Sequence, residues 1–319
     1  MTATDLRNPG IALDASLFEH ARVNTPAAQR RAESLKARRS VKKQWQAAWL
    51  VKAITCIDLT TLAGDDTPQR VARLCAKARR PLRQDLVAGL GLEAAPPRVA
   101  AVCVYPSMVP AAVRALEGSG IPVASVAAGF PSGLTPLRER LAEIDYAVQE
   151  GAGEIDIVIT RAHVLSQNWQ ALYEEIQAMR ARCGAAHMKA ILATGDLKTL
   201  RNVYQASMVA MMAGADVIKT STGKEEVNAT LPVGLVMCRA IRDYRSATGH
   251  DIGFKPAGGI RTAKDALNWL ALMNEELGRA WLEPGMFRIG ASALLGDIER
   301  QLEHFVTGRY AALHHHAMA

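Results

Sequence analysis

Short apolar runs rich in valine and isoleucine recur from Trp49 onward and alternate with longer stretches of helical periodicity. This pattern is expected of repeated βα units around a parallel sheet, whose strands are buried on both faces. The expected strands are VKAITCID (51–58), RVAAVCVY (98–105), PVASVAA (122–128), EIDIVI (154–159), HMKAILA (187–193), DVIKTS (216–221), DIGFKP (251–256) and MFRIGA (286–291). Eight such units in one chain of this length predict an α/β fold closed into a (β/α)8 TIM barrel.

Three of the intervening stretches are well-marked amphipathic helices, expected at residues 137–150, 169–182 and 263–277. Pro136, Ser166 and Thr262 precede them, and turn or capping residues are typical of helix starts. A doubly wound open sheet is the alternative arrangement, but it more often has about five to seven strands and a glycine-rich turn after the first. The first expected strand leads into CIDLTTL, which contains no glycine, and this favours the barrel.

The net charge of +7 is concentrated in one segment. Residues 21–46 contain eight basic residues and one acid, Glu33, so this segment accounts for the whole surplus. The basic residues are Arg22, Arg30, Arg31, Lys36, Arg38, Arg39, Lys42 and Lys43. Such a run could bind an acidic partner but is more often the solvated face of a helix. We therefore predict a basic helical extension over residues 1–47, a barrel domain over residues 48–319 and no nucleic-acid partner.

The cysteines indicate a reducing compartment. Their number is odd and no CxxC pair occurs, which fits neither a disulfide framework nor a zinc site. They are Cys56, Cys75, Cys103, Cys183 and Cys238. Asp5, Asp14 and Glu19 argue against a transit peptide, and no apolar run approaches the length of a membrane span. We expect a cytoplasmic protein without a membrane partner.

Polar and charged side chains gather at the carboxyl ends of the expected strands, where barrels of this kind carry their functional sites. They are Asp58, Thr60, Cys103, Tyr105, Asp156, Lys219, Lys255 and Ser292. A lone strand-end lysine usually reaches solvent or pairs with a carboxylate. Burying one among Val, Ile and Phe is costly unless it is paired or neutral.

Lys219 and Lys255 occur in matching contexts, because VIKTSTG and GFKPAGG each place a glycine four positions after the lysine. Both are therefore expected at the same level of neighbouring strands, which lie about 4.8 Å apart. Two ammonium groups that close repel each other, so one should lose its proton near neutral pH and become a carbonyl nucleophile. Asp156, a carboxylate within EIDIVI, could serve this chemistry or form a structural ion pair with either lysine.

Glycine-containing turns follow the last three expected strands: STGK (221–224), AGGIR (257–261) and RIGAS (288–292). Loops after strands seven and eight of a barrel frequently bind phosphate through glycine amides and a helix N-terminus. Each turn alone is a weak indication, but together they predict a phosphate site. The motifs HExxH, GxSxG and GxxxxGK[ST] are absent and the eight histidines form no ligand pattern, so we expect no metal.

The segments CIDLT, AVCVYP, GAGEIDIVI, GADVIKTSTGK, GFKPAGGIR and FRIGAS together resemble the deoxyribose-phosphate aldolase family, over residues 45–310. The segment before the first strand is similar to that of longer, eukaryotic-type members. The resemblance implies a (β/α)8 barrel without a metal or organic cofactor. It also implies reversible cleavage of a small phosphorylated sugar, 2-deoxy-D-ribose 5-phosphate, to acetaldehyde and D-glyceraldehyde 3-phosphate, and it leaves a homo-oligomer open.

The matching motifs imply individual roles. Lys219 matches the family's Schiff-base lysine, Lys255 the second lysine that tunes its pKa and exchanges protons, and Asp156 the aspartate that carries protons. Substrate-binding roles are implied for Asp58, Thr60, Cys103, Gly223, Lys224, Gly258, Gly259, Gly290 and Ser292. Some members have a second serine where this chain has Ala293, from which we expect altered phosphate affinity. A tyrosine of the family's C-terminal tail can reach the site, and Tyr310 is the nearest candidate.

Two other functions stay open. Another Schiff-base barrel enzyme, such as a transaldolase-like or keto-acid aldolase, would use the same lysine with a different donor. A non-catalytic barrel could instead be recruited to nucleic acid through the basic arm. That barrel would show salt-sensitive binding that disappears when residues 1–46 are deleted, and it would form no lysine adduct.

Overall fold

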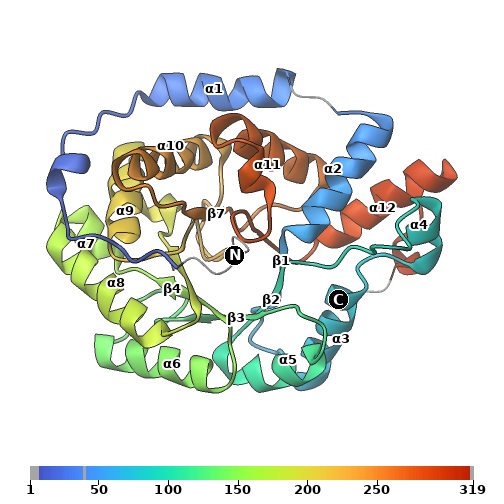
Figure 1. The fold of residues 1–319 in the computed structure, drawn as a ribbon, viewed down its shortest axis with the longest axis horizontal. Helices are drawn as coiled ribbons and strands as arrows, with labels where there is room; N and C mark the ends of the chain where they lie inside the picture. The colour runs from blue at the N-terminus through green and yellow to red at the C-terminus, as the bar shows by residue number, and fades with distance from the viewer. Residues whose placement is uncertain (1–6, 39–40, 317–319) are drawn as a thin grey trace.

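The computed structural model describes residues 7–38 and 41–316; Asp5 and Arg39, which entered the arguments above, lie outside this part. Eight parallel strands lie at the centre, inside a ring of helices (Figure 1). The strands are β1 (Ile57–Thr60), β2 (Ala101–Val104), β3 (Val123–Ala127), β4 (Glu154–Val158), β5 (His187–Ile191), β6 (Val217–Lys219), β7 (Gly253–Lys255) and β8 (Ile289–Ala291).

The sheet closes on itself. Strands that follow one another in sequence pair from β1 to β7, and β1 also pairs with β8. Between β7 and the last strand the ring is joined by single bridges, Phe254 with Phe287 and Ala257 with Gly290. All residues of β3 and β4 are buried, as expected where helices cover the outside of a parallel sheet. The predicted (β/α)8 barrel is confirmed.

The helices are α1 (Thr25–Arg38), α2 (Lys43–Thr55), α3 (Pro68–Arg79), α4 (Gln84–Gly89), α5 (Val109–Leu116), α6 (Leu137–Gln149), α7 (Arg161–Leu165), α8 (Trp169–Cys183), α9 (Leu200–Met212), α10 (Leu231–Thr248), α11 (Ala263–Glu276) and α12 (Leu294–Thr307). The three predicted helices, α6, α8 and α11, are confirmed to within one residue. Within the described residues, none of the helices is long and apolar enough to cross a membrane.

The three predicted helices follow turn or capping residues, as expected. Pro136 immediately precedes α6, and Thr262 forms a capping box with Asp265 at the start of α11. Ser166 lies in the turn between α7 and α8 as the C-cap of α7, and it does not itself cap α8. Asn168 caps α8 instead, where its side-chain oxygen accepts a hydrogen bond from the amide of Ala171 at 3.2 Å.

The first expected strand begins too early. Residues 51–55 belong to α2, whose buried side chains Ala47, Leu50, Ala53 and Ile54 recur at helical spacing and face the barrel. A short apolar run cannot be assigned to strand or helix from periodicity alone, and here packing of α2 against α11 and α12 decides. Of the expected strand, only Ile57 and Asp58 belong to β1, and Cys56 directly precedes it.

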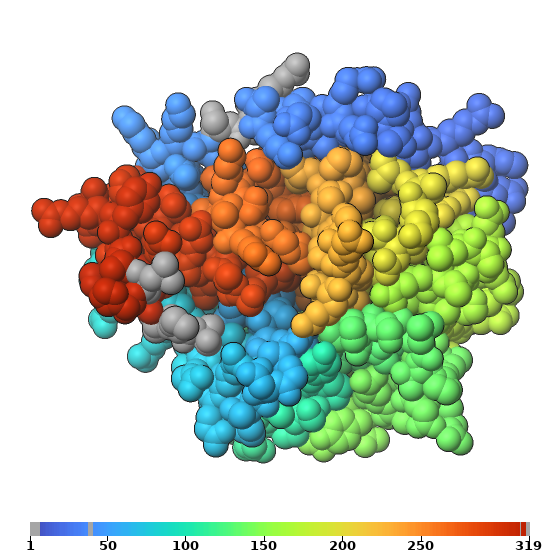
Figure 2. Space-filling view, turned by 180° about the vertical axis from the view of Figure 1, so that it is seen from behind, coloured from blue at the N-terminus to red at the C-terminus, as the bar shows by residue number. Residues whose placement is uncertain are grey.

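The N-terminal segment packs against the outside and the amino end of the barrel. Helix α1 lies on α10 and α11, as the space-filling view shows (Figure 2). Before it, the buried Asn8 donates from its side-chain amide to the carbonyls of Met211 and Ala215, just ahead of β6. Arg31 of the basic segment pairs with Glu275 at 2.7 Å. The boundary between residues 47 and 48 stays a prediction.

Candidate active site

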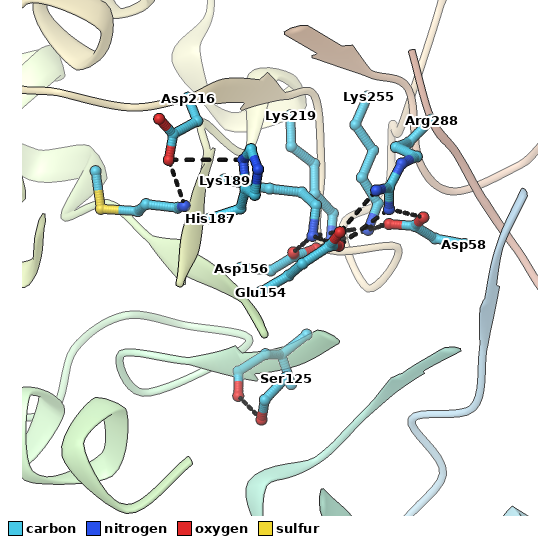
Figure 3. A network of polar contacts seen from close by, with 12 residues as sticks. Asp58, Ser125, Glu154, Asp156, His187, Lys189, Asp216, Lys219, Lys255 and Arg288 are labelled. Atoms are coloured by element: carbon cyan, nitrogen blue, oxygen red, sulfur yellow. Dashed lines mark hydrogen bonds and ion pairs between the residues drawn. The ribbon is translucent and has the colours of Figure 1, made fainter. Parts of the chain in front are cut away.

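Seven charged side chains meet inside the barrel (Figure 3). Each is at most 8% exposed. They are Asp58, Glu154, Asp156, Lys189, Lys219, Lys255 and Arg288, which we call the charged network. Five strands supply six of them, and Arg288 directly precedes β8. Such a set of buried charges is stable only if its members pair with one another.

Strand register places the two predicted lysines side by side. Lys219 of β6 lies opposite Lys255 of β7, which confirms that the two stand at the same level of the barrel. Both ammonium nitrogens donate to the same oxygen of Asp156, Lys219 Nζ at 2.7 Å and Lys255 Nζ at 2.8 Å. Lys255 also donates to Asp58 at 2.5 Å. Asp156 therefore connects the candidate nucleophile to its neighbouring lysine.

Three members of the charged network were not predicted as site residues: Glu154, Lys189 and Arg288. Lys189 Nζ donates to the second oxygen of Asp156 at 2.8 Å and lies 2.6 Å from Glu154. Arg288 lies 2.6 Å from both Asp58 and Glu154. The argument applied to Asp156, a charge inside an apolar strand, applies equally to EIDIVI, HMKAILA and MFRIGA and could have found all three.

The charge balance of the network singles out Lys219. Three carboxylates face four cations, so one cation has no charge to offset it. Burial lowers the pKa of Lys255, but Asp156 and Asp58 raise it more strongly, and the net pKa is raised. Burial also lowers the pKa of Lys219; there Asp156 acts against it but Lys255 adds to it, and the net pKa falls below its usual value.

Asp156 is held ionised. Burial alone would raise the pKa of this carboxyl, but Lys189, Lys219 and Lys255 together lower it well below its ordinary value. The pKa of Lys189 is raised, since its neighbouring carboxylates outweigh the effect of burial. The lowered pKa of Lys219 favours its neutral amine, and the lowered pKa of Asp156 favours its carboxylate, the combination that nucleophilic attack and proton transfer require.

A cavity of about 750 Å³ opens above the charged network, and Lys219 is the member of the network that lines it. Thr60, Gly223, Lys224, Gly258, Gly259, Gly290 and Ser292, all predicted as substrate-binding, also line it. Asp58, Asp156 and Lys255 are buried and do not line the cavity. A ligand carbonyl in the cavity would therefore meet Lys219 first.

Two glycines of the cavity wall are required by shape. A Cβ at Gly258, where φ is +82°, would lie 2.6 Å from Asn228 Oδ1. At Gly290 it would lie 3.2 Å from Lys255 Cε and 2.9 Å from Ala257 Cβ. A Cβ at Gly259, where φ is +79°, would meet nothing within 4 Å, so this glycine faces open space. Gly290 thus leaves room for the Lys255 side chain.

The N-termini of α11 and α12, the helices that follow the last two glycine-containing turns, differ. At α11 the first amides are occupied, because Asp265 and Thr262 form the capping box and Asp297 accepts from the amide of Ala263 at 2.7 Å. At α12 the preceding residue is Ala293, which offers no side-chain cap. Of the two helices, α12 therefore has the N-terminus available to an anion.

The STGK loop contains its own acceptor. Glu225 receives hydrogen bonds from the Thr222 amide at 3.0 Å, the Thr222 hydroxyl at 2.8 Å and the Gly223 amide at 3.2 Å. The amide of Gly223, expected to face the phosphate, already has a partner. Lys224, the next residue, presents its side chain at the cavity, where it remains available to a ligand.

Three further residues differ from expectation in their position relative to the cavity. Cys103 is fully buried in a small cluster with Ala124 and Val126 and does not line the cavity. Tyr310 is 61% exposed and stacks on His304 with ring centroids 4.1 Å apart, also away from the cavity. His316, which no sequence pattern indicated, does line it.

The described residues contain no group of three or more His, Cys, Asp or Glu side chains placed to hold a metal ion. The carboxylates of the charged network each contact a lysine or arginine nitrogen instead. The groups that line the cavity include the amines of Lys219 and Lys224 and the guanidinium groups of Arg261 and Arg300, which suit a carbonyl compound that carries an anion.

Comparisons with known proteins identify the family of the chain. The model of a family described as DeoC/LacD family aldolase matches residues 52–295. The chain belongs to the DeoC/LacD aldolase family. Its relatives in this family include the deoxyribose-phosphate aldolase of Homo sapiens, 62% identical over 309 residues that span 96% of this chain and 97% of that protein. The protein of the same name from Mus musculus is 61% identical over 307 residues, 96% of each chain.

A solved structure shares the fold of this family member. The deoxyribose phosphate aldolase of Aeropyrum pernix, whose structure is described as tetrameric, superposes with a TM-score of 0.59 at 22% identity. The match covers 85% of this chain and 100% of that chain.

Proposed function

We propose that the chain is a 2-deoxy-D-ribose-5-phosphate aldolase, an aldehyde-lyase that works through a Schiff base on Lys219. The observation that carries this proposal is the lysine pair on Asp156, in which Lys219 has the lowered pKa and lines the cavity. The relatives at 62% and 61% identity, both named deoxyribose-phosphate aldolase, support the choice of substrate.

The first half of the cycle forms the Schiff base. The neutral amine of Lys219 adds to C1 of the open-chain sugar aldehyde and gives a carbinolamine. Asp156, 2.7 Å from Lys219 Nζ, accepts the proton that the nitrogen loses and passes it to the oxygen, which completes the carbinolamine. A second proton, passed from Lys255 through Asp156, then converts the hydroxyl to water. Loss of water leaves an iminium, whose positive charge draws electrons from the neighbouring carbon–carbon bond.

The second half breaks the sugar. Asp156 takes the proton of the C3 hydroxyl while the C2–C3 bond breaks, and its electron pair moves into the iminium. D-glyceraldehyde 3-phosphate leaves and an enamine of acetaldehyde stays on Lys219. Protonation at C2 followed by addition of water releases acetaldehyde and restores the amine.

Lys255 has an electrostatic role in this proposal. Its ammonium group shares one oxygen of Asp156 with Lys219, so it competes for the carboxylate and repels a second positive charge. Asp58 holds Lys255 in place at 2.5 Å. Lys255 therefore keeps Lys219 unprotonated and can pass a proton to Asp156.

The substrate's phosphate is proposed to bind at the opposite side of the cavity, where Lys224, Gly258, Gly259 and Ser292 meet the uncapped start of α12. Binding energy from this remote group orients the sugar at Lys219. Because the position after Ser292 is Ala293, that residue offers an amide but no hydroxyl.

The remaining properties are proposals of the same kind. All five cysteines are free and buried, which supports a cytoplasmic location. Arg31 is engaged with Glu275 and Glu276, which supports a packed rather than a nucleic-acid-binding arm. Independence from metals and cofactors follows from the chemistry of a lysine Schiff base. A homo-oligomer stays open.

The test is product formation from 2-deoxy-D-ribose 5-phosphate. We expect acetaldehyde and D-glyceraldehyde 3-phosphate in equal amounts, with activity unaffected by a metal chelator. A different Schiff-base aldolase would leave this sugar intact and turn over a ketone or keto-acid donor. A barrel without activity on any of these substrates, and with RNA or DNA binding that requires residues 1–46, would support the non-catalytic alternative.

A further inference from the structure

Three cations that line the cavity have no ion-pair partner. They are Lys224, Arg261 and Arg300, and in the part of the chain that the structure describes no carboxylate lies within ion-pair distance of any of them. Other cations of the same cavity are paired: Arg70 lies 2.9 Å from Asp65, and Lys77 lies 2.6 Å from Glu299. Lys224 and Arg261 follow β6 and β7 in the glycine-containing turns. Arg300 lies on a helix, in none of the turns predicted to bind phosphate.

Arg300 differs from the other arginines of the described residues that have a buried, unsatisfied nitrogen. These others are Arg7, Arg140 and Arg161. Each of them bonds through another nitrogen, for example Arg140 to Glu175 at 2.5 Å. Arg300 Nε is buried without an acceptor, and no other nitrogen of this side chain bonds within the described part of the protein. A buried charged donor without a partner is unfavourable, so Arg300 is suited to an acceptor from outside the chain.

The carboxylates of α12 cannot serve Arg300, because all three have other partners. Asp297, three residues away on the same helix, accepts from the Ala263 amide. Glu299 contacts Lys77, and Glu303 contacts Arg83 at 2.8 Å. The sequence places Arg300 among acids, yet the fold leaves its charge uncompensated.

Helix geometry directs Arg300 toward the uncapped end of α12. Ala293, Gly296, Asp297 and Arg300 all line the cavity, and their spacing of three and four places them on one face. Long side chains on a helix lean toward its N-terminus, and this tendency would bring the guanidinium group toward Ser292 and Ala293. An anion at that end would therefore meet the free amides of α12 and the Arg300 guanidinium together.

We propose that Arg300 binds the substrate's phosphate and is a specificity-determining residue for phosphorylated over unphosphorylated sugars. The inference rests on the proposed function for the identity of the sugar, but not for the binding of the anion. A phosphomonoester carries about −1.5 to −2 charges at neutral pH, which Lys224, Arg261 and Arg300 together with the start of α12 are sufficient to offset. Arg300 compensates for the hydroxyl that Ala293 lacks.

The experiment compares Arg300→Met and Arg300→Lys with Arg114→Met, an exposed arginine of α5 on the outside of the barrel. For Arg300→Met we expect the ratio of kcat/KM for 2-deoxyribose 5-phosphate to that for 2-deoxyribose to fall about 10- to 100-fold, mainly through KM. Arg300→Lys should recover part of the loss, and Arg114→Met should leave both rates unchanged. Equal losses on both sugars, or an unchanged ratio, would overturn the proposal.

A second measurement does not depend on the reaction. Inorganic phosphate should raise the Tm of the wild-type protein by binding the folded state, and Arg300→Met should reduce this rise while Arg114→Met retains it. If phosphate stabilises Arg300→Met as much as wild type, the inference fails even where the aldolase activity stands. If the sugar phosphate is not cleaved but stabilisation by phosphate still requires Arg300, the proposed function fails and the anion site stands.

Discussion

The two sides of the cavity handle charge in opposite ways. Beneath Lys219, three carboxylates and their lysine and arginine partners satisfy one another at 2.5–3.0 Å and are almost completely buried. Across the cavity, Lys224, Arg261 and Arg300 have no carboxylate partners in the described protein. The first arrangement fixes protonation states before a substrate arrives, and the second leaves binding energy for the substrate to use.

This contrast predicts a separation of activity from stability at Lys219. In Lys219→Met we expect activity to fall by at least about 1,000-fold, because the nucleophile is lost. The free energy of unfolding should stay within about 1 kcal/mol of wild type, since the carboxylates have enough positive partners without a charge on Lys219. Steady-state rates and urea unfolding measure the two quantities. Strong destabilisation would show that Lys219 is a structural partner of Asp156.

Lys189 should behave in the opposite way with respect to stability. It contacts both Asp156 and Glu154, so Lys189→Met leaves buried negative charge uncompensated and should cost about 3–5 kcal/mol of unfolding free energy. Urea unfolding beside Lys219→Met gives a matched comparison of two buried lysines. Similar stabilities for the two variants would contradict the charge balance described for the network.

The role of Lys255 is visible in pH dependence. Activity requires neutral Lys219 and so rises with pH through the pKa of that amine, which is lowered in the native site. Lys255→Leu removes a like charge and frees an oxygen of Asp156, and both changes favour protonated Lys219. The acid limb of the kcat/KM profile should move to higher pH by at least about one unit. A profile that stays in place would rule out this role.

A smaller effect tests the boundary between the two regions. The Cβ of Gly290→Ala would press on Lys255 Cε and Ala257 Cβ, so displacement of Lys255 should reduce kcat about tenfold. Gly64→Ala is the matched control, since its Cβ meets nothing within 4 Å and its φ is not in the left-handed region. If the two alanine variants are equally active, Gly290 is not needed for the position of Lys255.

The sequence predicted the barrel and the centre of the site because both depend on local patterns. The repeat of apolar strands defines the fold, and the matching contexts of Lys219 and Lys255 place them at one level. Lys189 and Arg288 were not identified, because their role depends on which strands are neighbours in the barrel and on which carboxylates their side chains contact. The helical state of residues 51–55 depends on packing against α11 and α12, which a short apolar run does not reveal.

Arg300 is another residue whose role could not be predicted from the sequence. Its sequence neighbours Asp297, Glu299 and Glu303 suggest a compensated surface helix, whereas the structure engages each of these acids with another group. Whether a charge is free depends on the partners of its neighbours, and that information exists only in the folded chain.

The most direct test of the account is reductive trapping. The protein is incubated with acetaldehyde and sodium borohydride, and the modified residue is located by peptide mass spectrometry. The account predicts a gain of one ethyl group on Lys219, and loss of the label in Lys219→Met. Labelling of Lys255 or Lys189 in the wild-type protein, or trapping that occurs only with a ketone donor, would contradict it.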